Sequence, residues 1–255
     1  MRIRSVKETA KQALKGKWGI AIGVFFINSI LASIIGWIPE DYYFLLLVGT
    51  FLISGPLYIG YSWFHLDLKR NDNLSVKTLF QGFSMKYGRN ILSYFLLTVF
   101  TALWTLLLII PGIIKGLAYS MTFFILRDRP ELTSLQAITE SRKIMNGKKK
   151  NLFLLLLSFL PWFIIPFILI IIGFTSMIVG ISADPALIFA GIASLIIGGI
   201  AMLGISIYVT PYYSTAIAVF YDDYAKPRED LTEQGPLTPN YDTTSDNYNL
   251  TKPVQ

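Results

Sequence analysis

Residues 19–38 read GIAIGVFFINSILASIIGWI, a run of twenty residues without a charged side chain. A helix needs about 20 apolar residues to cross the hydrocarbon core of a bilayer. Residues 1–18 before the run are rich in lysine and arginine, whereas residues 39–43 after it contain two acids and no base. The run is too long for the core of a cleaved secretory signal. We therefore interpret it as a retained first membrane span.

The alternation of bases and apolar runs continues along the chain. Of the 22 lysines and arginines, 21 lie in four stretches, and only Lys115 lies elsewhere; the stretches are residues 1–18, 65–89, 127–150 and 226–252. The loops at 39–43 and 182–185 contain no base. Lysine and arginine near span ends are retained on the cytoplasmic side. The pattern therefore predicts a multi-pass protein of the cell membrane with both termini in the cytoplasm.

Composition supports the membrane class and excludes several others. Charged residues make up 15% of the chain, hydrophobic residues 53%, and the mean hydropathy is +0.54, whereas a soluble chain carries about 25% charged residues. The net charge of +6 could indicate nucleic acid, but the bases flank apolar runs instead of forming one stripe. We therefore predict no nucleic-acid partner and expect anionic lipid headgroups as the counter-charge. The chain has no cysteine, which excludes disulfides, thiolate metal sites and a cysteine nucleophile.

The apolar runs predict an all-α fold, a polytopic helical bundle of about six membrane spans arranged as three hairpins. The membrane domain is expected over residues 1–224, with spans at 19–38, 44–64, 91–110, 113–126, 152–181 and 186–221. After residue 224, the composition changes to Thr, Asn, Asp and Pro. Such a composition has too few aliphatic residues to form a core. Residues 225–255 are therefore expected to form a disordered cytoplasmic tail.

Two features of these spans stay open. Pro111-Gly112 is expected at the outer turn of the second hairpin, because proline removes a backbone donor. That position leaves residues 113–126 short for a full span, so a re-entrant arm is the alternative. Residues 152–221 are longer than two spans require, so a third span within them is also possible.

A polar segment with helical signals precedes each expected hairpin. Ser5 with Glu8 and Thr133 with Gln136 match the capping-box pattern, and Ser75 can cap the middle segment. Apolar residues follow each signal at roughly helical spacing. We expect an amphipathic helix at each place along the inner leaflet, with its apolar stripe against lipid or against the bundle.

The inner ends of the hairpins resemble one another. Three tyrosines each stand nine residues before an aspartate, in the pairs Tyr58 and Asp67, Tyr119 and Asp128, and Tyr213 and Asp222. Three units of amphipathic helix plus hairpin are therefore a plausible internal repeat. Aromatic belts alone also place tyrosine near span ends, so the pattern is a weak signal.

Several motifs occur in the order found in a known family. They are Leu14-Lys15-Gly16-Lys17-Trp18, Gly55-Pro56-Leu57, residues 106–115, Tyr119-Ser120-Met121, Pro130-Glu131-Leu132, Ala137-Ile138, residues 141–145, Pro211-Tyr212 and residues 220–223. Through them the chain resembles the DUF975 family of integral membrane proteins from Gram-positive bacteria, over about residues 5–224. It is more distantly similar to the membrane part fused to some glycerophosphodiester phosphodiesterases. The resemblance implies no activity that could be assigned to particular residues, and the third hairpin is longer than the family's usual one.

The candidate binding residues are four lysines. Lys115 is the one ionisable group close to a span interior, where a charge is by default a functional hypothesis. We favour a side chain that extends to the outer interface over one that binds an anionic headgroup or a substrate. Lys148, Lys149 and Lys150 precede the fifth span and could bind anionic lipid. We favour a role as topology determinants for these three.

Catalytic, cofactor and metal sites are not predicted. His65 is the only histidine, which rules out paired-histidine metal sites, and we interpret it as an interfacial side chain where the second span meets the cytoplasm. The sixteen acids lie in loops, span ends or the tail, which argues against a proton relay at mid-bilayer. No phosphate-binding glycine loop or nucleophile elbow occurs.

The combined pattern predicts a protein that is not an enzyme. We expect a scaffold, or a module that binds lipid and a membrane protein partner. The alternative is a small transporter or exporter component for a lipid-like or peptide substrate, with prolines in the long spans as hinges and Lys115 in contact with the substrate.

Overall fold

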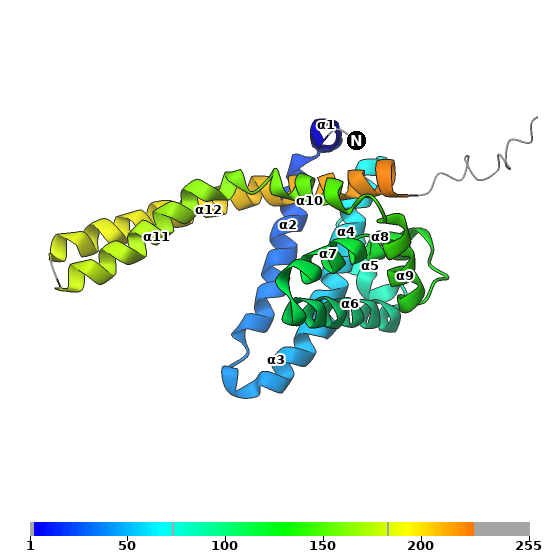
Figure 1. Cartoon of the computed structure of the whole chain (residues 1–255), viewed down its shortest axis with the longest axis horizontal. Helices are drawn as coiled ribbons and strands as arrows, with labels where there is room; N and C mark the ends of the chain where they lie inside the picture. The colour runs from blue at the N-terminus through cyan, green and yellow to red at the C-terminus, as the bar shows by residue number, and fades with distance from the viewer. Residues whose placement is uncertain (1–2, 73, 183, 227–255) are drawn as a thin grey trace, which may run out of the picture.

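The computed structural model describes residues 3–226 except 73 and 183, and the predicted tail from residue 227 onward lies outside the described residues. The described residues form helices and contain no strand (Figure 1). The α-helices are α1 (Ile3–Leu14), α2 (Trp18–Ser33), α3 (Tyr43–Gly49), α4 (Gly55–Arg70), α5 (Lys77–Ser84), α6 (Tyr87–Leu107), α7 (Ile109–Tyr119), α8 (Thr122–Asp128), α9 (Ser134–Ile144), α10 (Lys149–Leu157), α11 (Pro161–Ser182) and α12 (Pro185–Phe220). Short 3₁₀ turns, η1 (Ile34–Trp37) and η2 (Glu40–Tyr42), and π turns, η3 (Thr50–Ser54) and η4 (Tyr221–Ala225), extend or join them.

Six helical segments of the described chain are long and apolar enough to cross a membrane. They are Trp18–Trp37, Tyr43–Arg70, Tyr87–Leu107, Ile109–Asp128, Pro161–Ile181 and Pro185–Ala225. Large apolar side chains stay exposed along them; Trp37 and Leu106 are each 86% exposed. Soluble monomers rarely expose apolar surface on this scale. The six segments therefore indicate a multi-pass membrane protein.

The core of the protein surrounds α4. The indole nitrogen of Trp63 donates a hydrogen bond to the carbonyl of Phe123 at 2.8 Å, and Trp63 itself is fully buried. Helices α1, α2, α5, α6, α8 and α12 all pack against α4. Both the apolar surface and the indole N–H of Trp63 are thus satisfied inside protein rather than lipid. The second segment is therefore a central helix over the length of α4.

Helices α11 and α12 pack along each other and extend away from the rest of the protein (Figure 1). Four glycines lie at close approaches between them, and a Cβ there would come within 3.0 Å of the partner helix; they are Gly173, Gly180, Gly191 and Gly198. Small residues let helix backbones approach closely in a membrane. A Cβ at Gly199 or Gly204 would meet no neighbouring atom of the described chain. In this helix pair, only the glycines that face the partner helix permit close packing.

The turn of the second helix pair lies at a different residue from the predicted one. Leu108 has the extended conformation that separates α6 from α7, and Pro111 lies in the first turn of α7. Proline is tolerated there because the first N–H groups of a helix have no intrahelical partner. A Cβ at Gly112 would lie 2.6 Å from Cα of Thr105, so this glycine permits close packing against α6. The segment Ile109–Asp128 consequently has 20 residues, more than expected.

The third block of the chain holds two long helices. A break after α10 separates Lys149–Leu157 from α11, which begins at Pro161. Pro166 lies inside α11 and Pro211 inside α12, so neither proline ends its helix. Helix α12 begins at Pro185, where the carboxylate of Asp184 caps the N–H of Ala186 at 2.8 Å.

The three polar segments form helices α1, α5 and α9; Leu79 of α5 and Ile138 of α9 are buried, whereas Phe80 and Leu135 are 44% and 56% exposed. Val6, Ala10 and Leu14 of α1 are fully buried, mainly against α12 and α4. The capping box of Thr133 with Gln136 is present in α9. The one proposed for Ser5 with Glu8 is wrong, because α1 begins before Ser5 and Glu8 binds Arg4.

Helices α4 and α5 approach each other at two glycines. A Cβ at Gly60 would lie 1.9 Å from the carbonyl oxygen of Leu79, and one at Gly82 would lie 2.0 Å from that of Pro56. Both are contacts with backbone, so no side-chain rotation can relieve them. The position of α5 on the central helix therefore depends on these two missing side chains.

We predict that Gly82→Ala lowers the free energy of unfolding by about 3 kcal/mol, because overpacking that cannot relax reaches the upper end of its usual range. Unfolding of the purified protein in detergent, followed by tryptophan fluorescence, measures this. Gly88→Ala is the matched control, since a Cβ at Gly88 meets no atom within 4 Å. An equal effect of both substitutions would contradict the proposed α4–α5 contact.

Candidate functional site

Three helix ends that the placement of bases predicts on the cytoplasmic side, and that we therefore call inner ends, meet at one arginine. Arg70, the last residue of α4, donates two hydrogen bonds to the carboxylate of Asp128 at 2.7 and 2.9 Å. It also donates to Oδ1 of Asp222 from Nε at 2.9 Å and from Nη2 at 2.7 Å. Asp128 ends α8 and Asp222 follows α12. The planar guanidinium thus joins two carboxylates from distant parts of the chain.

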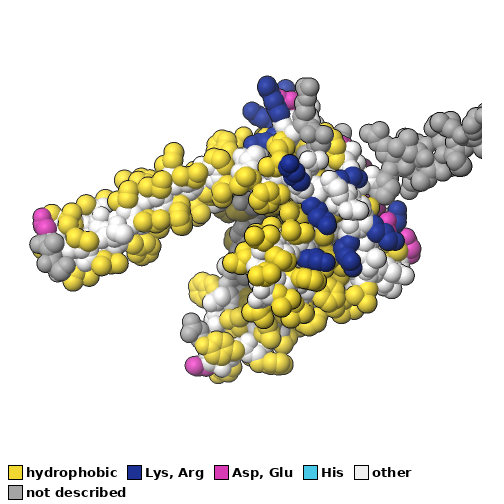
Figure 2. All heavy atoms as spheres, viewed as in Figure 1, with side chains coloured by type: hydrophobic (Ala, Val, Ile, Leu, Met, Phe, Trp, Pro, Cys, Tyr) yellow, Lys and Arg dark blue, Asp and Glu magenta, His cyan; other side chains and the backbone are white. Residues whose placement is uncertain are grey.

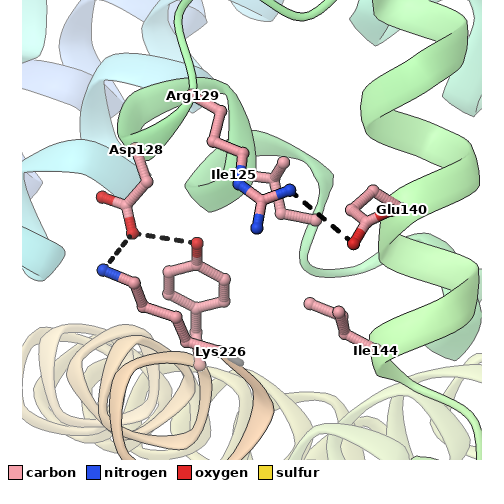
Figure 3. Close-up of a pocket in the computed structure, with 7 residues that line it drawn as sticks. Ile125, Asp128, Arg129, Glu140, Ile144 and Lys226 are labelled. Carbon is pink, nitrogen blue, oxygen red and sulfur yellow. Dashed lines mark hydrogen bonds and ion pairs between the residues drawn. The ribbon is translucent and has the colours of Figure 1, made fainter. Parts of the chain in front are cut away.

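Further groups complete the pairing of the two aspartates. The hydroxyl of Tyr221 donates to Asp128 at 3.0 Å, and the ammonium of Lys226 lies 3.1 Å from the same carboxylate (Figure 3). Lys69 lies 2.8 Å from Asp223 and 3.7 Å from Asp222. Each carboxylate of this group therefore has a cationic partner.

The third aspartate of the tyrosine–aspartate pattern has a separate arginine. Asp67 lies 3.0 Å from Nη2 of Arg127 and accepts a hydrogen bond from the hydroxyl of Thr78 at 3.2 Å. Arg127 also donates to the side chain of Gln81 and lies 5.2 Å from the ring centre of Trp63. Asp67 is buried, with 6% exposure, so the charge needs these partners. This pair ties α8 to α4 and α5.

We refer to these eight residues as the inner-end cluster: Asp67, Lys69, Arg70, Arg127, Asp128, Asp222, Asp223 and Lys226. It contains four acids and four bases, so its formal charge is zero. The side chains of Arg70, Asp128 and Asp222 are 24%, 12% and 19% exposed. Pairs this shielded from water matter more to structure than surface pairs do. The cluster is therefore a structural joint between α4, α8 and α12.

The space beside this cluster is small. A cavity of about 60 Å³ lies between Asp128, Arg129, Glu140, Tyr221 and Lys226 (Figure 3). Arg129 and Glu140 face each other across one side of it at 3.7 Å. Such a volume holds about two water molecules, which is too little for an organic substrate. Among the described residues, no group of three or more His, Asp or Glu could hold a metal ion.

The four predicted lysines lie in two different places. Lys115 lies on α7 with its ammonium 4.4 Å from the ring centre of Trp104, a cation–π contact. Lys148 donates to the carbonyl of Ala225 at 3.3 Å, next to the inner-end cluster. Lys149 is half-buried as the first residue of α10, and Lys150 is exposed. Lys115 is thirteen residues before Asp128, or about 20 Å along a helix. Lys115 therefore does not form one site with the other three.

The expectation of an interfacial His65 is wrong, because the residue is fully buried. Its Nδ1 lies 2.9 Å from the hydroxyl of Thr215, which donates to the carbonyl of Pro211 at 2.8 Å. The hydroxyl then accepts from His65, which assigns the proton to Nδ1. Burial against α12 gives His65 a structural position between two helices.

Sequence reasoning missed a cavity of about 460 Å³ among the spans. Tyr58 and Tyr213 line it, together with Tyr61 and Tyr94. Tyr119 is instead buried against Phe100 and Ile138. The nine-residue spacing could have indicated the cavity for two of the three tyrosines in the pattern, because Tyr58 and Tyr213 stand at equal distances from acids of the inner-end cluster.

Comparison with known proteins identifies one family. The model of the family described as "Protein of unknown function (DUF975)" matches residues 1–115 and 98–226. Neither the curated proteins nor the solved structures that were compared contain a match.

We predict that Arg70→Ala lowers the free energy of unfolding in detergent by about 3 kcal/mol, because it leaves shielded carboxylates without their shared partner. Arg70→Lys should restore less than half of the loss, since an ammonium cannot pair with both carboxylates in the same geometry. Arg4→Ala is the matched control. It breaks an arginine–carboxylate pair whose side chains are 89% and 57% exposed, and it should change stability by less than about 1 kcal/mol. Similar losses for Arg70→Ala and Arg4→Ala would refute the structural role of the cluster.

Proposed function

Because the chain belongs to the DUF975 family, whose function is unknown, we propose a function from the structure itself. The protein is a non-catalytic integral membrane protein of the cytoplasmic membrane. It acts as a scaffold that binds anionic lipid headgroups and a membrane protein partner through its inner face.

The observation that carries this proposal is the basic inner face. Exposed bases gather on α1, on the segment from α5 to α6, and on the segment from α9 to α10; they are Arg4, Lys11, Lys15, Lys77, Lys86, Arg142, Lys143 and Lys150. Figure 2 shows the blue side chains together on one part of the molecule, away from the tip of the α11–α12 pair. Asp41 and Asp184 are exposed near the opposite ends of the helices. Since the inner-end cluster is neutral, these exposed bases supply the attraction for anionic headgroups.

The placement in the membrane follows from the same face. The basic side is the cytoplasmic side, so both termini are cytoplasmic and the three helix pairs form hairpins, with outer ends near Asp41, near Leu108 and where α11 and α12 meet. In this orientation, the polar faces of α1, α5 and α9 lie toward the surface of the inner leaflet. A bacterial cell membrane and the distant relation to phosphodiesterase membrane domains remain predictions from the resemblance.

The non-catalytic assignment rests on how the reactive groups are used. The acids of the inner-end cluster are paired with arginine or lysine, and the imidazole of His65 lies between α4 and α12. A general base needs a group free to take a proton from a substrate. The groups described here instead hold helices together.

The alternative function, a transporter or exporter component, is favoured by the cavity between the spans. Its proposed substrate contact, Lys115, already has Trp104 as a partner within the protein. That contact supports an anchoring role for Lys115 near the membrane interface. If the protein is a transporter, Lys115→Ala is expected to leave flux unchanged in a reconstituted assay.

We predict that replacing Lys149 and Lys150 by glutamine weakens association with phosphatidylglycerol about fivefold for each lysine, since each cation near an anionic surface contributes about 1 kcal/mol. The protein is reconstituted in bilayer discs containing phosphatidylcholine and phosphatidylglycerol, and spin-labelled lipids report the selectivity. Lys115→Gln is the control, because Lys115 lies outside the basic segments and its ammonium contacts the ring of Trp104. An unchanged preference in the double variant would refute the headgroup-binding role.

We predict opposite sidedness for two single cysteines introduced into the naturally cysteine-free chain. Asn146→Cys, in the basic segment, should react with a membrane-impermeant maleimide only after the cells are permeabilised. Asp184→Cys, between α11 and α12, should react in intact cells. Labelling of Asn146→Cys from outside would overturn the proposed orientation.

A further inference from the structure

The cavity between the spans has a lining that is polar but uncharged. Among the described residues that line it, hydroxyls come from Tyr58, Tyr61, Tyr94 and Tyr213, from three serines and from Thr210, and an amide comes from Asn28. No charged side chain of the described chain lines it. Its residues come from five of the six candidate spans and from α10. The helix pairs therefore converge around this space.

In the proposed orientation, on which this inference rests, the cavity lies at the depth of lipid acyl chains. Tyr58 and Tyr213 stand nine residues before Asp67 and Asp222, which is about 13 Å along a helix. With the inner-end cluster placed at the membrane surface and α4 crossing the bilayer, about 13 Å along α4 is within the hydrocarbon, whose half-thickness is about 15 Å. Hydroxyl groups at that depth are unfavourable unless hydrogen-bond partners accompany them. Ser62 and Ser120 donate to the carbonyls of Tyr58 and Leu117 at 2.9 and 2.8 Å, so polar contents would serve mainly the tyrosine hydroxyls.

The chemistry of the lining selects an uncharged head. A phosphate at this depth would need a cation beside it, because an unpaired buried charge is strongly unfavourable, and the lining offers none. The rings of Tyr58, Tyr94 and Phe123 lie 5.6 to 6.4 Å apart and form an aromatic wall. Two lining residues, Asn28 and Tyr61, have a buried side-chain oxygen with no partner within hydrogen-bond distance among the described residues. These groups offer donors and acceptors to hydroxyls.

An apolar groove adjoins the cavity. It has a volume of about 470 Å³ and shares Gly116 and Leu156 with the cavity. Apart from Thr101 and Thr105, its described lining is glycine and large apolar residues, including Phe153 and Leu160 of the α10 region. A hydroxyl-lined space that continues into an apolar groove matches a molecule with a small polar head and an acyl chain. Both volumes lie in the usual range for ligand sites.

We propose that this cavity binds the uncharged, hydroxyl-bearing head of a neutral lipid of the diacylglycerol type, with an acyl chain in the adjoining groove. The hydroxyls of Tyr58 and Tyr213 bind the head, and Gly116 leaves the passage between the two spaces open. A Cβ at Gly116 would have only a methyl of Thr101 nearby, at 3.6 Å. The site is separate from the basic inner face in both position and chemistry.

The test uses the full chain in bilayer discs with three photoreactive probes of equal acyl length: a diacylglycerol, a phosphatidylglycerol and a headless alkane. Wild-type protein should crosslink the diacylglycerol most strongly, at residues of the cavity located by peptide mass spectrometry. Equal labelling by the headless alkane, or stronger labelling of the cavity by phosphatidylglycerol, would overturn the proposal. A sugar-bearing diacylglycerol as competitor distinguishes a free hydroxyl head from a glycosylated one.

Variants separate this site from its alternatives. The double variant Tyr58→Phe and Tyr213→Phe should lower diacylglycerol labelling about tenfold, as expected for two lost hydrogen bonds, while labelling by the alkane stays unchanged. Tyr43→Phe is the matched control, because Tyr43 is 69% exposed and lies outside the cavity. Gly116→Leu should block the passage and lower labelling by both probes.

Two further outcomes keep the proposal open to refutation. If the double variant does not fold, Thr210→Val tests the polar lining by itself, and unchanged labelling there would overturn the site. The glutamine variants of Lys149 and Lys150 should lose phosphatidylglycerol selectivity but keep diacylglycerol labelling. Loss of one property without the other therefore shows which of the two proposals fails.

Discussion

The structure depends on one guanidinium group that holds two carboxylates. Asp128 and Asp222 lie 58 and 152 residues from Arg70 along the chain, yet both accept its hydrogen bonds. Apolar helices in a lipid bilayer gain little from hiding apolar surface from one another, because lipid is equally apolar. Directional polar contacts therefore decide which helix ends meet. Arginine suits this task because its planar fork presents five donors in a fixed arrangement.

Burial in the protein follows from this joint. Where α4, α8 and α12 meet, side chains such as Trp63, Phe64 and Phe220 are fully buried. Away from the joint, α11 and α12 contact mainly each other, and their outer faces remain apolar and exposed. The chain thus has a protein-like core at the inner end and lipid-facing helix pairs beyond it. Glycines permit close approach in both regions, between α4 and α5 and between α11 and α12.

The sequence allowed the membrane class and the approximate helices to be predicted, because apolar length and the placement of bases are local properties. It did not allow the turn at Leu108 to be found, since a proline is equally compatible with a turn and with the first turn of a helix. The burial of His65 depends on α12, 150 residues away, which no local pattern reveals. The tyrosine–aspartate spacing indicated the right acids, but it could not show that Arg70 serves two of them while Arg127 serves the third. The same spacing grouped Tyr119 with Tyr58 and Tyr213, although only the latter two share a cavity.

The length of α12 has a mechanical consequence. Its 36 residues span about 54 Å, against a hydrocarbon thickness of about 30 Å. Pro211 lies close to its inner end, 26 positions, or about 39 Å, after Pro185. Pro211 therefore divides the helix into a short and a long part. A bend of about 5° at the proline would displace the far end of the long part by about 3 Å. Because α11 packs along α12, the two helices would move together. A small change of angle at Pro211 would then produce a large displacement at the far end of the helix pair.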